Sequence, residues 1–252
     1  DGTTFTDYSG VPRNSVTVNG DTNTSITQKK FGTTSAHFDN NGDWILVPGT
    51  ADWNAYGTDF TVDFWIYPES FQDYDMLIGC NNANAYGWNI QLGSTQQLYF
   101  MVGESGSWDF NTAGAGGLTA LTANQWYHVA MVKSGTTWNL YLDGTLYSGP
   151  FTSNSHNSNT VDLRIGVDAP WGVNRWYHGY MDEVRISKSA RWDGNFTPST
   201  SAYVNDAATV LLMHMDGADG GTTFTDSALG HPISVSGDTK QERPTSRHNI
   251  VA

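Results

Sequence analysis

The sequence predicts an all-β fold, a two-sheet antiparallel sandwich, and three observations lead to it. Charged residues make up 15% of the chain and aromatic residues 13%, with 27 glycines among 252 residues. This composition suits many short strands joined by glycine-bearing turns. About ten short strand-like runs are present, and no helical segments alternate with them. A sandwich is therefore favoured over an α/β fold.

The clearest strand spans residues 60–67, with the sequence FTVDFWIY. Its apolar residues recur at every second position from Phe60 to Ile66, which is the period of a strand with one buried face. Turn residues separate nearly all of the further candidate strands. These are residues 43–47, 76–80, 88–92, 98–102, 126–132, 163–167 and 180–186.

Two shorter elements follow from local signals. Residues 138–142 and 145–147 flank Asp143-Gly144, a pair that accepts the positive φ angles of a type I′ turn, so they predict a tight hairpin. Residues 187–192 follow the last strong strand. We expect a helical turn there, before Pro198.

The charge balance limits the partners. Twelve Lys and Arg against 25 Asp and Glu give a net charge of −13, which repels phosphate backbones and anionic membrane surfaces. We expect no nucleic-acid partner and, with no apolar stretch of membrane-spanning length, no membrane insertion. Acidic and Asn-rich loops suit hard cations, so a structural Ca²⁺ ion is the expected cofactor. The single cysteine, Cys80, lies in an apolar run, and a buried strand thiol is favoured over a reactive one.

An internal repeat organises the chain. The sequence GTTFTD at 2–7 recurs at 221–226, and VTVNGDT at 16–22 is answered by ISVSGDT at 233–239. A strand-like run at 209–216 precedes the second copy only. We therefore predict a sandwich domain at 1–203 and an extension at 204–252 that carries this strand and the half-repeat. The strand adds to a sheet edge, either within its own chain or in a neighbouring copy. Its candidate assembly residues are Leu211, Leu212, Met213, His214 and Met215.

Three separated motifs resemble the concanavalin A-like, laminin-G-like jelly rolls that recur in phage tail and bacterial surface proteins. They are FGTTSAHFDNNGDWI at 31–45 followed by DFTVDFW at 59–65, QWYHVA at 125–130 with LYLDG at 140–144, and GYMDEVRI at 179–186. The resemblance spans about residues 1–203 and implies a concanavalin A-like jelly roll. The segment 211–226 resembles the family's opening strand, so its C-terminal place is a departure from the family pattern.

The same resemblance implies a metal site. Related jelly rolls hold a structural calcium ion where the first turns meet the last strand, and the matching positions here are Asp7, Asp39 and Asp182. The run DNNGD at 39–43 also gathers oxygen ligands around a glycine turn, as calcium loops do. Such turns are equally ordinary without a metal.

Saccharide binding requires a flat aromatic face beside amide or carboxylate groups. The loop at 168–178 combines these features, and Trp171, Asn174 and Trp176 are its candidate glycan-binding residues. Trp108 and Tyr86 are lesser candidates. The alternative is that these aromatic side chains plug the ends of the sandwich or lie at subunit contacts.

No catalytic residue is predicted. Glycosidases of this fold need paired carboxylates on one sheet face, and the sequence has no Glu-x-Asp-x-Glu run. Asp182 and Glu183 are adjacent and would face opposite sides of a regular strand, and Asp63 stands alone. For His128, in mid-strand, we expect a hydrogen-bonded core or cross-strand role.

The favoured hypothesis is a non-enzymatic structural or adhesion protein at a virion surface or in the extracellular space. It would assemble through its C-terminal strand with itself or with other surface proteins, and it would bind glycans. The alternative is a monomeric carbohydrate-binding lectin module. A glycoside hydrolase or lyase of the same fold is the remote alternative.

Overall fold

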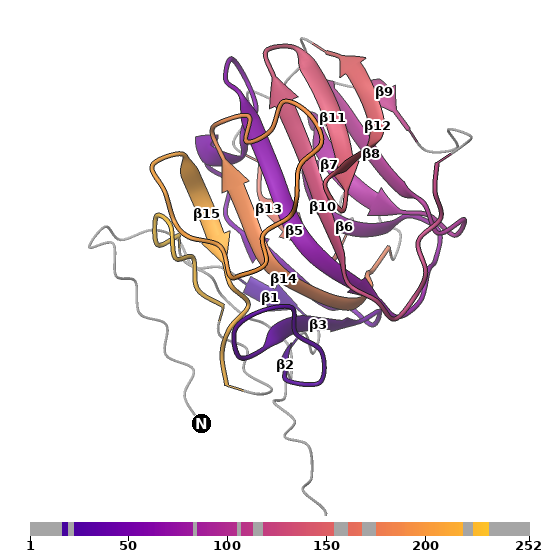
Figure 1. The fold of residues 1–252 in the computed structure, drawn as a ribbon, viewed down its shortest axis with the longest axis vertical. Coiled ribbons are helices and arrows are strands. Elements are labelled where there is room, and N and C mark those ends of the chain that lie inside the picture. Colours follow the sequence, from indigo (N-terminus) through magenta and orange to yellow (C-terminus); the bar gives the residue numbers. More distant parts are fainter. Residues whose placement is uncertain are drawn as a thin grey trace, which may run out of the picture.

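Two antiparallel sheets pack face to face in a computed structural model of the chain (Figure 1). The structure describes residues 17–19, 23–82, 85–104, 107–112, 118–153, 161–167, 175–218 and 224–231. The predicted all-β jelly-roll class is confirmed. Within these residues the seven-stranded sheet has the order β1 (Thr17–Asn19), β4 (Trp44–Val47), β13 (Leu163–Ile165), β6 (Asp75–Asn82), β7 (Ala85–Leu92), β8 (Leu98–Glu104) and β9 (Ser107–Asn111).

The second sheet has eight strands among the described residues. Its order is β12 (Thr145–Thr152), β11 (Thr137–Leu142), β10 (Tyr127–Ser134), β5 (Phe60–Pro68), β14 (His178–Ser187), β3 (Ser35–Asp39) and β2 (Asn23–Ser25), and β15 (Thr209–Met213) pairs with β14. The alternate apolar residues of both sheets form one core between them, which includes Phe64, Ile90, Phe100 and Val129. Burial of this shared core is the main driving force for the sandwich.

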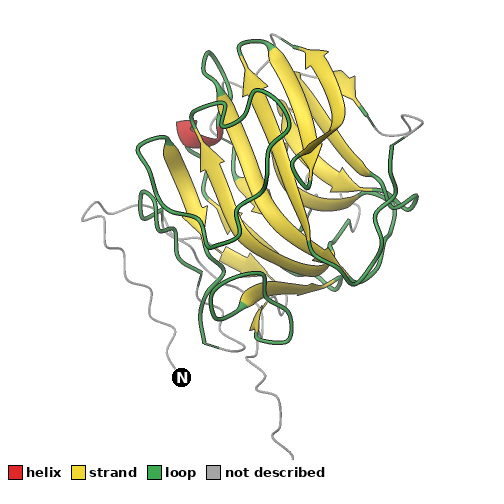
Figure 2. Cartoon of the chain, viewed as in Figure 1, coloured by secondary structure: helices red, strands yellow, loops and turns green. Residues whose placement is uncertain are grey.

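The hairpin prediction is confirmed, and the helix prediction is wrong. Asp143 and Gly144 have φ angles of 48° and 74°, as the turn between β11 and β12 requires. Residues 187–192 contain no helix. The helix that the described residues contain is a single 3₁₀ turn, Ala51–Trp53 (Figure 2). Contacts with other segments fix residues 187–192 in place of a helix: Arg191 donates its N–H to the Thr61 hydroxyl and pairs through both terminal nitrogens with Asp206.

Residues 188–208 form a segment that we call the strap. It connects β14 to β15 in the sequence and crosses the outer face of the eight-stranded sheet. This is the orange loop in front of the sheet in Figure 1. Phe196 donates its N–H to the Gly144 carbonyl at the β11–β12 turn, and its ring stacks on Trp192 with centroids 3.7 Å apart. The strap therefore covers what would otherwise be a solvated sheet face.

The sequence predicts that one face of β5 is buried, but both faces are buried because the strap covers the outer one. Thr61, Asp63 and Trp65 on the outer face are as buried as the apolar residues between them. The sequence pattern alone does not report a cover that comes from a distant segment.

The expectation that Asp182 and Glu183 face opposite sides of β14 is also wrong. Asp182 pairs with Trp65 and Arg185 pairs with Asp63, so β14 contains one extra residue and forms a β-bulge. Glu183 has a φ of 52° at this bulge. Both carboxylates consequently reach the outer face.

No helix among the described residues has the length and hydropathy needed to cross a bilayer.

Candidate functional site

The outer face of the seven-stranded sheet carries buried amides. Along β7, Trp88, Ile90 and Leu92 point into the core, so the alternating residues Asn89 and Gln91 point to the outer face. Both amide side chains are only 1% exposed. Two successive outward positions of β7 therefore carry polar side chains that are buried.

A groove of about 280 Å³ lies over these amides. We call it the amide groove, and its described lining residues are Tyr74, Asn89, Gln91, Met101, Trp108, Asn111 and Arg175. The Arg175 guanidinium lies 4.8 Å from the centre of the Tyr74 ring. The groove thus combines an amide floor with aromatic and cationic side chains, and its volume lies just below the ~300–1,000 Å³ range of ligand pockets.

A β-bulge places both Trp108 and Asn111 on the groove side. In the β8–β9 register Val102 pairs with Phe110 and Gly103 pairs with Trp108, so one residue of β9 is left over. Phe110 faces the core and contacts Phe100, while Trp108 and Asn111 line the groove. Gly103 is required at this crossing, because a Cβ there would overlap the backbone of Ser107 and Trp108.

The floor amides lack hydrogen-bond partners in the part of the chain that the structure describes. Among the described residues, neither the oxygen nor the nitrogen of the Asn89 and Gln91 amides accepts or donates a hydrogen bond, and the Asn81 nitrogen is in the same state. A buried polar group without a partner costs about 1–3 kcal/mol. Water or a ligand that offers both donors and acceptors would satisfy these atoms.

Of the predicted glycan-binding residues, the structure brings Trp108 to this groove. Trp108 lines it, as does Arg175 from the predicted loop. Trp176 forms an isolated bridge with Val167 and is not among the described lining residues. Trp171 and Asn174 lie outside the described residues, and of Tyr86 only the backbone, in β7, is described.

The two predicted calcium ligands that the structure describes, Asp39 and Asp182, do not converge. Asp7 lies outside the described residues, and Asp39 pairs with His178, four residues along β14 from Asp182. That separation is about 13 Å along a strand. Within the described chain no group of three or more His, Cys, Asp or Glu side chains is arranged to hold a metal. Asp39 and Asp182 therefore do not fit a shared ion, and calcium binding stays a prediction.

The local contacts of these carboxylates explain them without an ion. Asp182 accepts N–H bonds from Lys30 and Phe31 at 2.8 and 3.0 Å and from Glu183 at 2.9 Å. Burial raises the pKa of Asp182 to about 8 despite these bonds. Asp39 accepts from the Asn41 N–H in an Asx turn.

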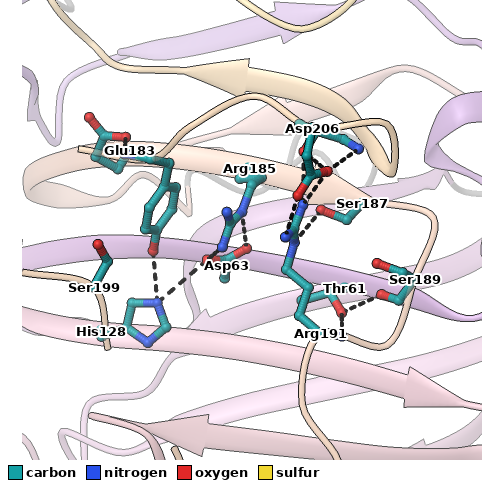
Figure 3. A network of polar contacts seen from close by, with 12 residues as sticks. Thr61, Asp63, His128, Glu183, Arg185, Ser187, Ser189, Arg191, Ser199 and Asp206 are labelled. Atoms are coloured by element: carbon teal, nitrogen blue, oxygen red, sulfur yellow. Dashed lines mark hydrogen bonds and ion pairs between the residues drawn. The ribbon is translucent and has the colours of Figure 1, made fainter. Parts of the chain in front are cut away.

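Asp63 does not stand alone, as the sequence suggested, but belongs to a buried network under the strap (Figure 3). Arg185 donates to its two oxygens at 2.9 and 2.8 Å. His128 Nε2 lies 2.8 Å from the Tyr203 hydroxyl and 3.6 Å from Asp63. Burial by itself raises the pKa of Asp63, but His128 and Arg185 together hold it below its ordinary value.

Glu183 completes the attachment of the strap. It accepts the Tyr203 N–H at 2.8 Å, and His214 Nδ1 lies 2.9 Å from its other oxygen. Asp63 and Glu183 each already have a charged or hydrogen-bonding protein partner, and both are buried. The network thus joins the strap and β15 to the sheet, and His128 has the hydrogen-bonded role predicted for it.

The predicted assembly residues pair within the chain. Leu211 lies opposite Ile186 and Met213 opposite Val184 on β14. Leu211, Met213 and Met215 enter the main core, Leu212 packs with Trp65 and Tyr203 on the outer face, and His214 contacts Glu183. The strand ends at Met213, three residues earlier than predicted, and Met215 has a φ of 55°. Of the two alternatives, this structure contains the one within the chain.

The sequence contains a signal for the floor of the groove, although Asn89 and Gln91 were not among the predicted site residues. Asn89 and Gln91 alternate with three large apolar residues in a predicted strand, and this spacing assigns the amides to one face. Asn111, Arg175 and Tyr74 carry no comparable signal, because a bulge and two loops bring them to the groove. Cys80, by contrast, is the buried strand thiol predicted, and burial raises its pKa to about 12.

Comparisons with known proteins agree with the architecture. A family model described as the concanavalin A-like lectin/glucanases superfamily matches residues 39–194. A candidate carbohydrate-binding protein from Bacteroides ovatus superposes with a TM-score of 0.55 at 19% identity, over 82% of this chain and 61% of that protein. A receptor binding domain gives a TM-score of 0.52 at 15% identity, over 71% of this chain and 43% of its own. These two likenesses concern the fold alone. Among curated protein sequences, none matches this chain.

Proposed function

The chain belongs to the concanavalin A-like lectin/glucanase superfamily, and from that premise we propose that it is a non-enzymatic glycan-binding module that holds a saccharide in the amide groove. The observation that carries the proposal is the pair of buried amides, Asn89 and Gln91, whose polar atoms have no partner among the described residues. They face a groove that Trp108 lines.

Saccharide chemistry matches these groups. Each sugar hydroxyl both donates and accepts a hydrogen bond, and each amide offers a donor and an acceptor. The apolar C–H face of a pyranose ring packs on a flat aromatic side chain such as Trp108. Hydration alone would satisfy the amides, but it does not require a flat aromatic side chain beside them.

The lining of the groove supports binding rather than hydrolysis. Its described lining residues are amide, aromatic, thioether and guanidinium side chains, with no carboxylate among them. Glycoside hydrolysis by the common mechanisms needs two carboxyl groups flanking the scissile bond. The buried carboxylates Asp63, Asp182 and Glu183 lie on the other sheet and are occupied by protein partners.

The proposed setting is adhesion, with the module displayed at a virion or cell surface outside the cell. The resemblance of its motifs to phage tail and bacterial surface proteins supports this setting. A glycan-binding groove on a rigid sheet face serves adhesion because binding requires no chemistry and no large movement.

The test begins with a glycan array that identifies a ligand for the whole chain. Isothermal titration calorimetry then compares the wild type with Trp108→Ala. We expect the substitution to remove about 2 kcal/mol of apolar contact, which is roughly a thirtyfold loss of affinity. Tyr56→Ala is the matched control, because Tyr56 is 56% exposed and lies outside the groove.

Two results would overturn the proposal. One is an array on which the folded protein binds no glycan, and the other is unchanged affinity in Trp108→Ala. Incubation of the array ligand with the wild type at high concentration tests the enzymatic alternative. Release of shorter saccharides would replace binding with hydrolysis as the function.

A further inference from the structure

The chain contains two copies of one segment, and the described sandwich uses half of each. GTTFTD occurs at 2–7 and 221–226, and VTVNGDT at 16–22 corresponds to ISVSGDT at 233–239. The first half in the structure comes from the C-terminal copy, within residues 224–231. The second half is β1, from the N-terminal copy. Residues 2–7 and 233–239 lie outside the described residues.

The first half closes the free edge of β15. Phe224 is buried in the main core. Asp226 accepts the Leu212 N–H at 2.9 Å, and the Ser227 N–H donates to the Leu212 carbonyl at 2.7 Å. The second oxygen of Asp226 lies 2.6 Å from His231 Nδ1, and His231 Nε2 lies 3.0 Å from Asp52. Asp226, His231 and Asp52 thus form a clamp on this half.

The second half is a short edge strand. In β1, Thr17 lies opposite Leu46 and Val18 opposite Ile45 of β4. The other side of β4 is occupied by β13. A three-residue strand at a sheet edge has few contacts of its own, so it detaches more easily than an inner strand.

The two halves lie next to each other. The Trp53 ring is 4.9 Å from the His231 ring, and Trp53 Nε1 donates at 3.0 Å to the carbonyl of Pro48, the residue after β4. Because β1 runs antiparallel to β4 from this end, the C-terminal half stops close to where β1 begins. One continuous copy of the repeat is therefore able to fill both places.

We propose that this closure site, formed by Leu212 of β15, Asp52 and the β4 edge, accepts residues 2–20 of a second copy of this chain. Phe5 and Asp7 of that copy repeat Phe224 and Asp226, which fill the site now, so exchange offers equivalents for the contacts of these two residues but not for those of His231. Reciprocal exchange gives a closed dimer, and one-way exchange gives a filament. The inference is independent of the proposed glycan binding.

The clamp decides which copy is held more strongly. The C-terminal copy reaches His231 five residues after Asp226, whereas the N-terminal copy continues from Asp7 as YSGVP and has no histidine there. The chain's own C-terminal copy is therefore favoured while the clamp is intact. Removing the clamp equalises the two copies and favours exchange.

Disulfide trapping in the full chain tests the proposal. One chain carries Thr17→Cys, and a second, size-tagged chain carries Leu46→Cys, so a disulfide between them is necessarily intermolecular. The native Cys80 does not compete, since it is buried. We expect linked heterodimers at several times the yield of a mixture of Ile26→Cys and Leu46→Cys chains. Ile26 is 37% exposed and lies outside the repeat.

A second arm tests the clamp. His231→Gln in the Leu46→Cys chain should raise the heterodimer yield further, and Asp52→Asn should do the same if the first variant folds poorly. Equal yields for the Thr17 and Ile26 mixtures would show that the β4 edge does not exchange. If neither clamp variant raises the heterodimer yield, the site that Asp226 occupies beside Leu212 and Asp52 is not part of the exchange.

Discussion

Two kinds of buried polar side chain occur in this molecule: those that satisfy each other and stabilise the fold, and those that the fold leaves without hydrogen bonds among the described residues. Arg185 and Asp63 are buried and satisfy each other. Asn89 and Gln91 are buried and satisfy nothing among the described residues. Natural sequences keep such groups where a ligand or water completes them. This contrast is the physical basis for separating structure from function here.

A first prediction follows for Gln91. Gln91→Met removes two unsatisfied polar atoms while keeping the volume of the side chain, so we expect the free energy of unfolding to stay level or rise by about 1 kcal/mol. Saccharide affinity should fall sharply. Gln97→Met is the control, because Gln97 Nε2 donates to the Leu118 carbonyl at 2.7 Å. Loss of this hydrogen bond should lower the free energy of unfolding by about 1 kcal/mol. Urea unfolding measures both, and a large destabilisation by Gln91→Met would contradict the assignment.

His231 predicts a pH dependence of stability. Burial alone would lower its pKa, but the hydrogen bonds and charges of Asp226 and Asp52 raise the pKa of His231 to about 9, above its ordinary value of 6.5. Its stabilising contribution is therefore fully present below about pH 6.5 and is lost as the pH rises through about 9. The melting temperature of the wild type should exceed that of His231→Gln at pH 6, and the difference should shrink by pH 9.5. A constant difference would contradict the clamp.

At the scale of elements, the sequence predicted the regular strands well. The candidates at 60–67, 76–80, 88–92 and 98–102 lie within β5, β6, β7 and β8. Alternation reports these strands because each has a face in the common core. The strand β3 and the edge strand β9 were missed. In β9 no residue is fully buried, so its burial contrast is weak.

Elements set by distant contacts were not predictable in this way. The strap has no period, because its path depends on Arg191 pairing with Asp206 and on Phe196 reaching Gly144. The bulges in β14 and β9 shift side chains to a face that strict alternation assigns wrongly. These bulges place Glu183 in the strap network and Trp108 in the amide groove. The least predictable features of the backbone thus position the residues of most interest.

The contact between hairpin and strap gives a prediction with a matched control. Gly144 and Gly135 have φ angles of 74° and 57°, so alanine is strained at both positions, by about 1–2 kcal/mol. A Cβ on Gly144 would also overlap the Phe196 carbonyl oxygen, whereas a Cβ on Gly135 meets nothing within 4 Å. Gly144→Ala should therefore cost at least about 1 kcal/mol more than Gly135→Ala in thermal or urea unfolding. Equal costs would show that the strap yields freely.

For the whole molecule, the boundary between the predicted domain and its C-terminal extension is not visible in the packing. Leu211, Met213 and Phe224 belong to the same core cluster as Phe64 and Ile90. The repeat in the sequence indicated that the C-terminal segment is related to the N-terminal one. It did not indicate that halves of both copies close one sandwich, because that depends on where the β4 and β15 edges lie in space.

The proposed glycan binding gives the two outer faces of the sandwich separate tasks, and a double-mutant cycle tests their independence. The amide groove and the strap network lie on opposite sheets, with the core between them, and stacked sheets are about 10 Å apart. Asp63→Asn leaves the Arg185 guanidinium without its buried partner and should destabilise the fold by about 3 kcal/mol. It should leave saccharide affinity unchanged under conditions where the protein stays folded. In the double mutant of Asp63→Asn and Trp108→Ala, we expect the effects on the binding free energy to be additive within about 0.5 kcal/mol in calorimetry. A larger coupling would mean that the strap shapes the groove through the core, and glycan binding would then be sensitive to closure of the C-terminal segment.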